Sequence, residues 1–332
     1  MGHQEHPDDS DRERAKRFGG SAWVTRRAFL ESASLGAGVH LAAATSSSSP
    51  RRPPVASPSQ AFSVGFQIFG WGRYFPSAWW KGAAAVGALG YRGIEGEYTI
   101  AELYTGRDDE FAAGMARAGV TLSALYSTTD LERAPEQWEN TRKNLAAAAF
   151  CARHGARTIV LGGTEAHDKS PAAIAAFCKA ATTLGRAMHD THGVRLAVHP
   201  HMGALIESRD DISRVMDGTD PAVFFLAPDT GHLLAAGCDP VEVCRTYAER
   251  IVHLHLKDYR PGAGGQRGAF LPLGDGGVDF AGLIDVLRQR GFSGWMNIEM
   301  DGGRGADPAD VARRALAFVE QRLHLVVRRE AA

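Results

Sequence analysis

Short apolar runs recur along the chain from residue 61, and longer segments with helical spacing of apolar residues lie between and after them. The runs predict eight β-strands, at residues 62–69, 91–97, 121–126, 156–162, 194–199, 223–229, 251–258 and 294–301. Helices are predicted between and after them, for example at 138–154, 171–192 and 308–323. This alternation predicts a parallel sheet, and eight units predict a closed (β/α)8 TIM barrel at residues 61–326. An open doubly wound sheet is the main alternative, but no Gly-x-Gly-x-x-Gly motif follows the first strand.

The predicted strand at 251–258 combines apolar and reactive residues in strict alternation. His253, His255 and Lys257 alternate with Val and Leu residues. Because strand side chains point alternately to opposite faces, the three reactive side chains share one face. This pattern is typical of a barrel wall that is apolar toward the helices and polar toward the interior.

The same alternation recurs on other predicted strands, near their carboxyl ends. The polar residues that share a face there are Glu95 with Glu97, His199 with His201, and Asn297 with Glu299 and Asp301; Asp229 and His232 follow a further strand. Active sites of TIM barrels lie at the carboxyl ends of the strands. We therefore expect these side chains to converge on one site.

Buried histidines and carboxylates in such numbers predict a metal site. Burying them without partners would be costly, and a divalent cation offsets that cost by taking Asp, Glu and neutral His as ligands. The four cysteines, at positions 151, 178, 238 and 244, form no CxxC pair and no zinc-finger spacing, which argues against a disulfide framework. The sequence predicts a site with nitrogen and oxygen ligands, for which Mn is the preferred ion and Mg, Co and Zn are alternatives.

The net charge of the chain bears on which partners are expected. The 332 residues include 37 basic and 38 acidic side chains, for a formal net charge of −1. This balance gives no electrostatic reason to expect a nucleic acid or an anionic membrane as partner. It leaves open whether the chain forms a homo-oligomer.

The N-terminal segment has the composition of an export signal and not of a folded domain. Arg26 and Arg27 precede Phe29, Leu30 and a mildly apolar run that reaches Ala44. Residues 1–44 resemble a twin-arginine (Tat) signal peptide, which predicts a periplasmic or extracellular protein. The Ser/Pro-rich residues 45–60 predict a linker. The alternative is a disordered tail with a chance Arg pair; a stable membrane anchor is disfavoured because the run falls short of about 20 clean apolar residues.

Three motifs resemble those of a known superfamily. They are Asp229-Thr230-Gly231-His232, His255-Leu256-Lys257-Asp258 and the Gly-Trp-x-x-Ile-Glu run that ends at Glu299. In this order they resemble the sugar phosphate isomerase/epimerase superfamily. This is the xylose isomerase-like TIM barrel shared with apurinic-site endonucleases, tagatose epimerases and inosose dehydratases. The runs at 199–203 and 271–280 are most similar to the inosose dehydratase branch.

The resemblance implies roles for particular residues. Asp229, His255 and Glu299 would be metal ligands, Glu299 also an acid or base, and Lys257 would assist catalysis. Many members have a glutamate on the fifth strand that is both ligand and base, whereas this chain has His199 there, and Glu207 is the nearest carboxylate. His199 and Glu207 both stay candidates for the fourth ligand, and His199 for a catalytic role. Substrate contacts are expected from His201, His232, Glu95 and Arg260.

The expected reaction starts with removal of a proton beside the carbonyl of a keto-sugar or inosose, which gives an enediolate. Isomerisation, epimerisation and elimination all stay open. Elimination is favoured because His199 replaces one of the two carboxylates that an epimerase uses. The Gly-rich loop at 259–277 is expected to form a flap over the substrate.

Two other functions are weighed against this one. An apurinic-endonuclease-like metal phosphodiesterase would need a basic surface, which the neutral charge and the export signal disfavour. A non-catalytic carbohydrate-binding barrel is disfavoured because Asp229, His255 and Glu299 are all present.

Overall fold

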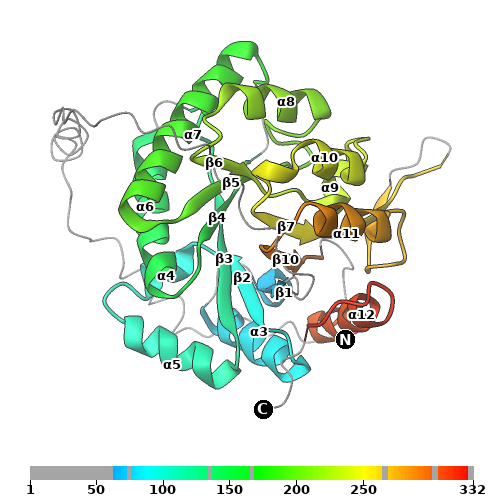
Figure 1. The fold of residues 1–332 in the computed structure, drawn as a ribbon. Helices are drawn as coiled ribbons and strands as arrows, with labels where there is room; N and C mark the ends of the chain where they lie inside the picture. The colour runs from blue at the N-terminus through cyan, green and yellow to red at the C-terminus, as the bar shows by residue number, and fades with distance from the viewer. Residues whose placement is uncertain are drawn as a thin grey trace, which may run out of the picture. The chain divides into compact units, whose positions relative to one another are not determined.

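Eight parallel strands form a single sheet that closes on itself (Figure 1). They are β1 (Ser63–Gln67), β2 (Gly93–Glu97), β3 (Thr121–Thr128), β4 (Thr158–Gly162), β5 (Arg195–His199), β6 (Phe224–Leu226), β7 (His253–Leu256) and β10 (Trp295–Ile298). Neighbouring strands follow the order β6-β5-β4-β3-β2-β1-β10-β7. Two isolated parallel bridges, Leu226 with Ile251 and Asp229 with His255, join β6 to β7 and complete the barrel.

The computed structural model describes residues 63–72, 76–133, 137–164, 168–263, 268–300 and 306–327. The signal segment predicted at 1–44 and the linker predicted at 45–60 lie outside these residues. No helix within the described ranges is long and apolar enough to cross a membrane.

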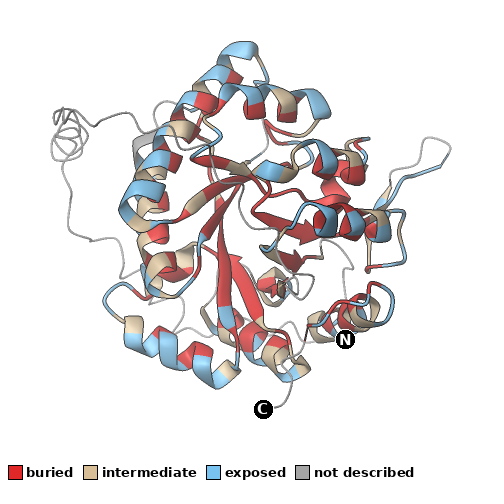
Figure 2. Cartoon of the chain, in the orientation of Figure 1, coloured by how far each residue is buried: buried red, intermediate tan, exposed pale blue. Residues whose placement is uncertain are grey.

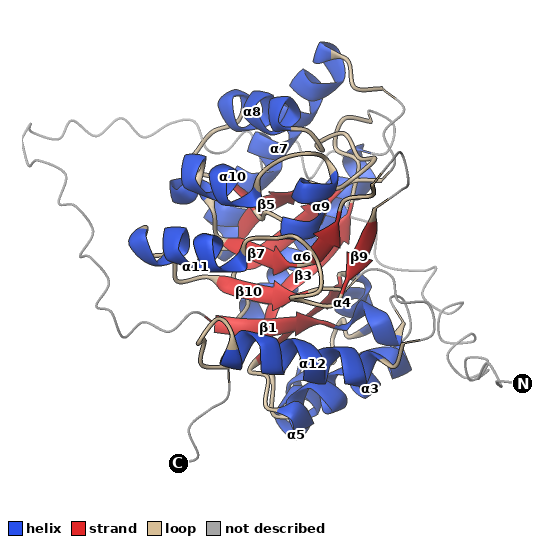
Figure 3. Ribbon diagram, turned by 90° about the vertical axis from the view of Figure 1, so that its right-hand side faces the viewer, coloured by secondary structure: helices blue, strands red, loops and turns tan. Residues whose placement is uncertain are grey.

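Helices surround the sheet, and their outward faces are exposed while the strands are buried (Figures 2 and 3). They are α3 (Pro76–Leu89), α4 (Thr99–Leu103), α5 (Asp108–Ala118), α6 (Gln137–Arg153), α7 (Pro171–His192), α8 (Arg209–Gly218), α9 (Thr230–Ala235), α10 (Pro240–Thr246), α11 (Phe280–Gln289) and α12 (Pro308–Gln321). The caps of α7 show why the sequence sets these bounds. Ser170 accepts a hydrogen bond from the backbone N–H of Ala173, Pro171 follows it, and Gly193 ends the helix in the left-handed conformation.

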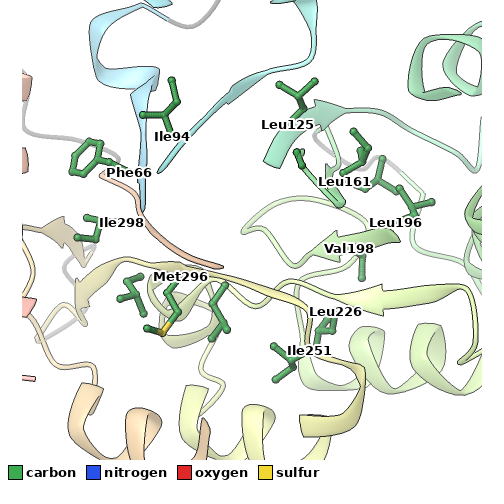
Figure 4. Packing of buried hydrophobic residues seen from close by; sticks show 14 of the residues in the cluster. Phe66, Ile94, Leu125, Leu161, Leu196, Val198, Leu226, Ile251, Met296 and Ile298 are labelled. Carbon is green, nitrogen blue, oxygen red and sulfur yellow. The ribbon is translucent and has the colours of Figure 1, made fainter. Parts of the chain in front are cut away.

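Side chains of opposite parity on the strands build two separate apolar layers. The large layer lies between sheet and helices and includes Phe66, Ile94, Leu125, Leu196 and Met296 (Figure 4). The small layer is mostly of the other parity, and its residues, in or next to the strands, are mostly small or β-branched: Ala124, Tyr126, Val160, Ala197, Ala227 and Val252, with Phe69 and Phe225 packed against them. The modest size of these side chains leaves the barrel interior room for polar groups.

The structure confirms the predicted TIM barrel, since each of the eight predicted strands overlaps an observed one. The sixth strand is shorter than predicted. Its regular pairing ends at Leu226, because Pro228 has no N–H for the sheet and Asp229 already caps α9. The loop at 259–277 carries a feature that the sequence did not predict, a two-stranded antiparallel hairpin of β8 (Asp258–Arg260) and β9 (Ala269–Leu271).

A glycine in β1 makes room for a polar side chain inside the barrel. A Cβ atom on Gly65 would lie 2.1 Å from Asn297 Oδ1 and 2.9 Å from the carbonyl oxygen of Gly93. We predict that Gly65→Ala lowers the free energy of unfolding in urea by about 1–3 kcal/mol, because overpacking forces neighbours from their positions. Gly277→Ala is the matched control, since its Cβ would meet no atom closer than 3.6 Å. Equal stability of the two variants would contradict this account of Gly65.

Candidate metal centre

Four side chains from four strand ends converge at the carboxyl end of the barrel. His199 ends β5, Asp229 follows β6, His255 lies in β7 and Glu299 follows β10. One nitrogen or oxygen atom from each lies within 4.8 Å of the others, and all four residues are buried. We call these residues the four-residue cluster. It contains the three ligands expected from the sequence together with His199.

Backbone contacts place the carboxylates of the cluster. Asp229 caps helix α9, where its Oδ1 atom accepts a hydrogen bond of 2.7 Å from the backbone N–H of His232. The cap directs Oδ2 toward His255, whose Nδ1 lies 3.9 Å away. Glu299 is held by its own backbone N–H, which donates to the carbonyl of Leu256 at 3.1 Å. Its Oε2 atom lies 2.6 Å from His255 Nδ1.

The chemistry of the cluster fits a divalent cation. Neither ring nitrogen of His199 has a hydrogen-bond partner among the described residues, although the side chain is buried. Burial, aided by neighbouring His255 and His232, holds the pKa of His199 well below its ordinary value. The ring is therefore neutral at pH 7 and has a lone pair to give. Two imidazoles and two carboxylates are ligands that Mn, Mg, Co or Zn accept, with the softer ions preferring more nitrogen.

Lys257 supplies a positive charge at the edge of the cluster. Its Nζ atom lies 3.0 Å from Glu299 Oε1, 3.3 Å from Asp229 Oδ2 and 3.0 Å from His232 Nε2. The hydroxyl of Thr230 accepts from the backbone N–H of Lys257 at 2.9 Å, which anchors the residue to α9. The negative charges of these two carboxylates offset the cost of burying the positive charge of Lys257.

A second polar group lies beside the cluster and shares His255 with it. It comprises Glu95 with Gln67, Ser123, His253 and Asn297, and we call it the inner network. Glu95 Oε1 lies 2.8 Å from His255 Nε2, and Glu95 Oε2 lies 2.8 Å from His253 Nε2. Burial alone would raise the pKa of Glu95, but the two imidazoles outweigh it and hold this pKa well below its ordinary value.

The carboxylates also act on the shared histidine. Burial lowers the pKa of His255, but Glu95 and Glu299 outweigh that effect and raise the pKa to about 10. A metal that takes His255 as a ligand therefore competes with a proton at neutral pH.

Aromatic side chains lie beside the cluster, where the rings of His201 and His232 neighbour that of His199. The His201 ring lies 3.8 Å from the His232 ring between centroids, and the Phe270 ring lies 4.9 Å from it. Lys257 Nζ lies 5.4 Å from the Phe270 centroid, within cation–π range. Phe270 also lines a cavity of about 1170 Å³ together with Tyr259. Phe270 thus borders both Lys257, which contacts the cluster, and a space large enough for a small ligand, although none of the four cluster residues lines that space.

Asp258 holds the hairpin that carries Phe270. Its carboxylate accepts hydrogen bonds from the backbone N–H groups of Gly274 at 2.9 Å, Gly276 at 2.8 Å and Val278 at 3.1 Å, besides that of Tyr259. A Cβ on Gly276 would lie 2.2 Å from Asp258 Oδ1, so the approach requires glycine there.

Three residues expected at the site have other surroundings. Glu207 lies outside the four-residue cluster, with its Oε2 atom 2.7 Å from Lys169 Nζ. The exposed Arg260 donates to the carbonyl of Asp275. Glu95 is fully buried in the inner network and not at the open end of the barrel.

Tyr126 was not among the residues expected at the site, although its position near the carboxyl end of β3 indicates that it could reach the cluster. Its ring stacks on His255, with centroids 6.1 Å apart and an interplanar angle of 22°, and meets the His199 ring edge-on at 5.4 Å. Gly162 leaves space for it, because a Cβ there would lie 1.8 Å from the phenol oxygen. Tyr126 thus packs against both imidazoles of the cluster.

Curated relatives match part of the chain. An inosose dehydratase of Clostridium botulinum (strain Alaska E43 / Type E3) is 32% identical over 144 residues, which are 39% of this chain and 48% of the relative. The inosose dehydratase of Geobacillus kaustophilus (strain HTA426) is 34% identical over 146 residues, 40% of this chain and 47% of the relative. The chain thus spans about half the length of the curated relatives it matches.

Solved structures share the fold over most of the chain. A xylose isomerase-like TIM barrel protein from Mycobacterium smegmatis, in complex with magnesium, superposes with a TM-score of 0.66 at 20% identity, covering 78% of this chain and 96% of that one. At such identity the likeness shows the fold alone. The family model of the xylose isomerase-like TIM barrel matches residues 83–322, and the chain therefore belongs to this family.

Proposed function

We propose that the protein is a metal-dependent enzyme that removes a proton beside the carbonyl of a keto-sugar or inosose and passes through an enediolate. One observation carries the proposal: buried His199, Asp229, His255 and Glu299 bring ligand atoms within 4.8 Å of one another, next to Lys257. The partial match to inosose dehydratases supports the choice of substrate class.

The four-residue cluster would hold the metal, with His199 as the fourth ligand in preference to Glu207. Glu207 forms an ion pair with Lys169, whereas neither ring nitrogen of His199 has a hydrogen-bond partner among the described residues. When bound, a divalent ion acidifies the proton on the carbon next to a coordinated carbonyl. Mn is our preferred ion; the Mycobacterium smegmatis relative was solved with magnesium.

The reaction we favour is elimination of a β-hydroxyl group. Glu299 takes the proton from the carbon beside the carbonyl, and the electron pair of that C–H bond forms the enediolate. As the electrons return, the bond from the β-carbon to its oxygen breaks, and Lys257 or His232 protonates the leaving oxygen to give water. The two side chains lie 3.0 Å apart, so either can replace the proton that the other gives up. Of the two cluster carboxylates among the described residues, we assign Glu299 as the base, because Asp229 already caps α9 through its Oδ1 atom.

The side chains beside the cluster suit a small polyhydroxylated substrate. His201 and His232 offer polar ring atoms, while Phe270 offers an apolar face next to a cavity of about 1170 Å³. We propose that substrate enters beside Phe270 and that the β8–β9 hairpin excludes water from the enediolate.

We propose in addition that the protein is exported through a twin-arginine signal. The proposal rests on the sequence alone, on Arg26 and Arg27 ahead of a mild apolar run.

Loss of a carboxylate from the cluster is expected to weaken metal binding. Asp229→Asn should raise the Kd for Mn²⁺, measured by calorimetry, by more than about 100-fold, because even residues that only orient metal ligands contribute about 10–100-fold. The matched control is Glu207→Gln, for which we expect wild-type affinity. The reverse ranking would mean that Glu207 is the ligand.

Glu299→Gln is expected to slow proton transfer strongly. The amide cannot accept the proton, and loss of a positioned base costs about 10²–10⁴-fold in rate. The readout is metal-dependent exchange of solvent deuterium into an inosose or keto-sugar, followed by NMR. Absence of exchange in the wild-type protein with every substrate of this class would refute the enediolate.

Export depends on the arginine pair. Arg26→Lys together with Arg27→Lys should retain the full-length protein in the cytoplasm of a bacterium with a Tat system, as judged by fractionation and immunoblotting. Unchanged export of the double variant would rule out this signal.

A further inference from the structure

We infer that Glu95 is a positioning residue that orients His255 toward the metal; this inference rests on the metal site proposed above. The carboxylate holds the Nε2 side of the imidazole, so that Nδ1 faces Asp229 and Glu299 and is the nitrogen left for a metal. Glu95 touches neither substrate nor metal in this account.

Four side chains contact the carboxylate of Glu95. Gln67 Nε2 donates to Oε1 at 2.9 Å, and Asn297 Nδ2 donates to Oε2 at 3.0 Å. His255 Nε2 and His253 Nε2 each lie 2.8 Å from the carboxylate, one beside each oxygen. Every neighbour in this set brings an N–H group, or a ring nitrogen that can carry a proton, to the carboxylate.

Burial of Glu95, with both carboxylate oxygens occupied by neighbouring side chains, argues for a place behind His255 and against the substrate contact expected from the sequence pattern. Its side chain is 0% exposed and lies inside the barrel. A buried carboxylate is costly unless charge and hydrogen bonds compensate it. The shared imidazole of His255 provides that compensation on one side and joins the four-residue cluster on the other.

The same geometry argues against a second metal between Glu95, His253 and His255. These residues lie close enough to hold an ion. Both carboxylate oxygens, however, already accept from the amide groups of Gln67 and Asn297. Those N–H groups occupy the carboxylate oxygens that an added cation would need, and their positive ends oppose its charge.

His255 is the histidine of the cluster that such an arrangement orients. Its Nδ1 atom lies 2.6 Å from Glu299 Oε2 and 3.9 Å from Asp229 Oδ2, while Nε2 faces Glu95. The stacked ring of Tyr126 limits tilting of the imidazole but cannot select which nitrogen is protonated. A carboxylate at Nε2 fixes that tautomer and makes Nδ1 a stronger ligand.

The test compares Mn²⁺ binding by the full chain in three forms: wild type, Glu95→Gln and Ser123→Ala. Glutamine keeps the volume but loses the charge, so we expect its Kd for Mn²⁺, by calorimetry, to rise by about 10–100-fold. Ser123→Ala is the matched control in the same network. It removes the 2.9 Å contact of Asn297 with Ser123 and leaves Glu95 and His255 in place. Its Kd should equal that of the wild type.

A second measurement does not depend on how the variants fold. In ¹⁵N-histidine NMR of the wild-type protein loaded with Zn²⁺, His255 should bind metal through Nδ1 and carry its proton on Nε2. Metal on Nε2, wild-type affinity in a folded Glu95→Gln protein, or a second Mn²⁺ that this variant loses would each overturn the positioning role. Failure of the wild type to bind any divalent ion would instead overturn the proposed function, and the positioning role with it.

Discussion

Compensation of buried charge is the constraint on which the rest of this structure depends. Glu95, Asp229 and Glu299 are carboxylates buried in or at the end of a barrel, where an unpaired charge is costly. Lys257 and His255 lie between them and balance part of that charge. His199 does not contribute, because its pKa is lowered and the ring is neutral. A cation at the four-residue cluster would complete the balance and use the lone pairs of His199.

The fold meets this constraint through small residues and through side chains with two tasks. The small side chains of Ala124 and Ala197 occupy little volume inside the barrel. The missing side chain of Gly65 leaves space for that of Asn297. Asp229 caps helix α9 with one oxygen and faces the cluster with the other. His255 joins the cluster to the inner network. Most of the hydrophobic core lies between the sheet and the helices, so the barrel interior can hold polar side chains.

The sequence predicted the barrel and the convergence of His199, Asp229, His255 and Glu299, because strand periodicity determines which face a residue occupies. The sequence does not show how far a residue lies from the open end of the barrel. Glu95 was therefore expected to contact substrate, whereas it is buried in the inner network. Nor could the sequence choose between His199 and Glu207, since the path of the loop between them is a tertiary property. The β8–β9 hairpin has only three residues in each strand, and it depends on Asp258, whose partners lie up to 20 residues away.

The most direct test of the account is anomalous diffraction at the manganese edge from crystals of the full chain grown with Mn²⁺. We predict one strong peak within coordination distance of His199, Asp229, His255 and Glu299, with Glu95 behind His255 and away from the ion. A peak coordinated by Glu207, or the absence of any peak at these four residues under saturating Mn²⁺, would contradict it.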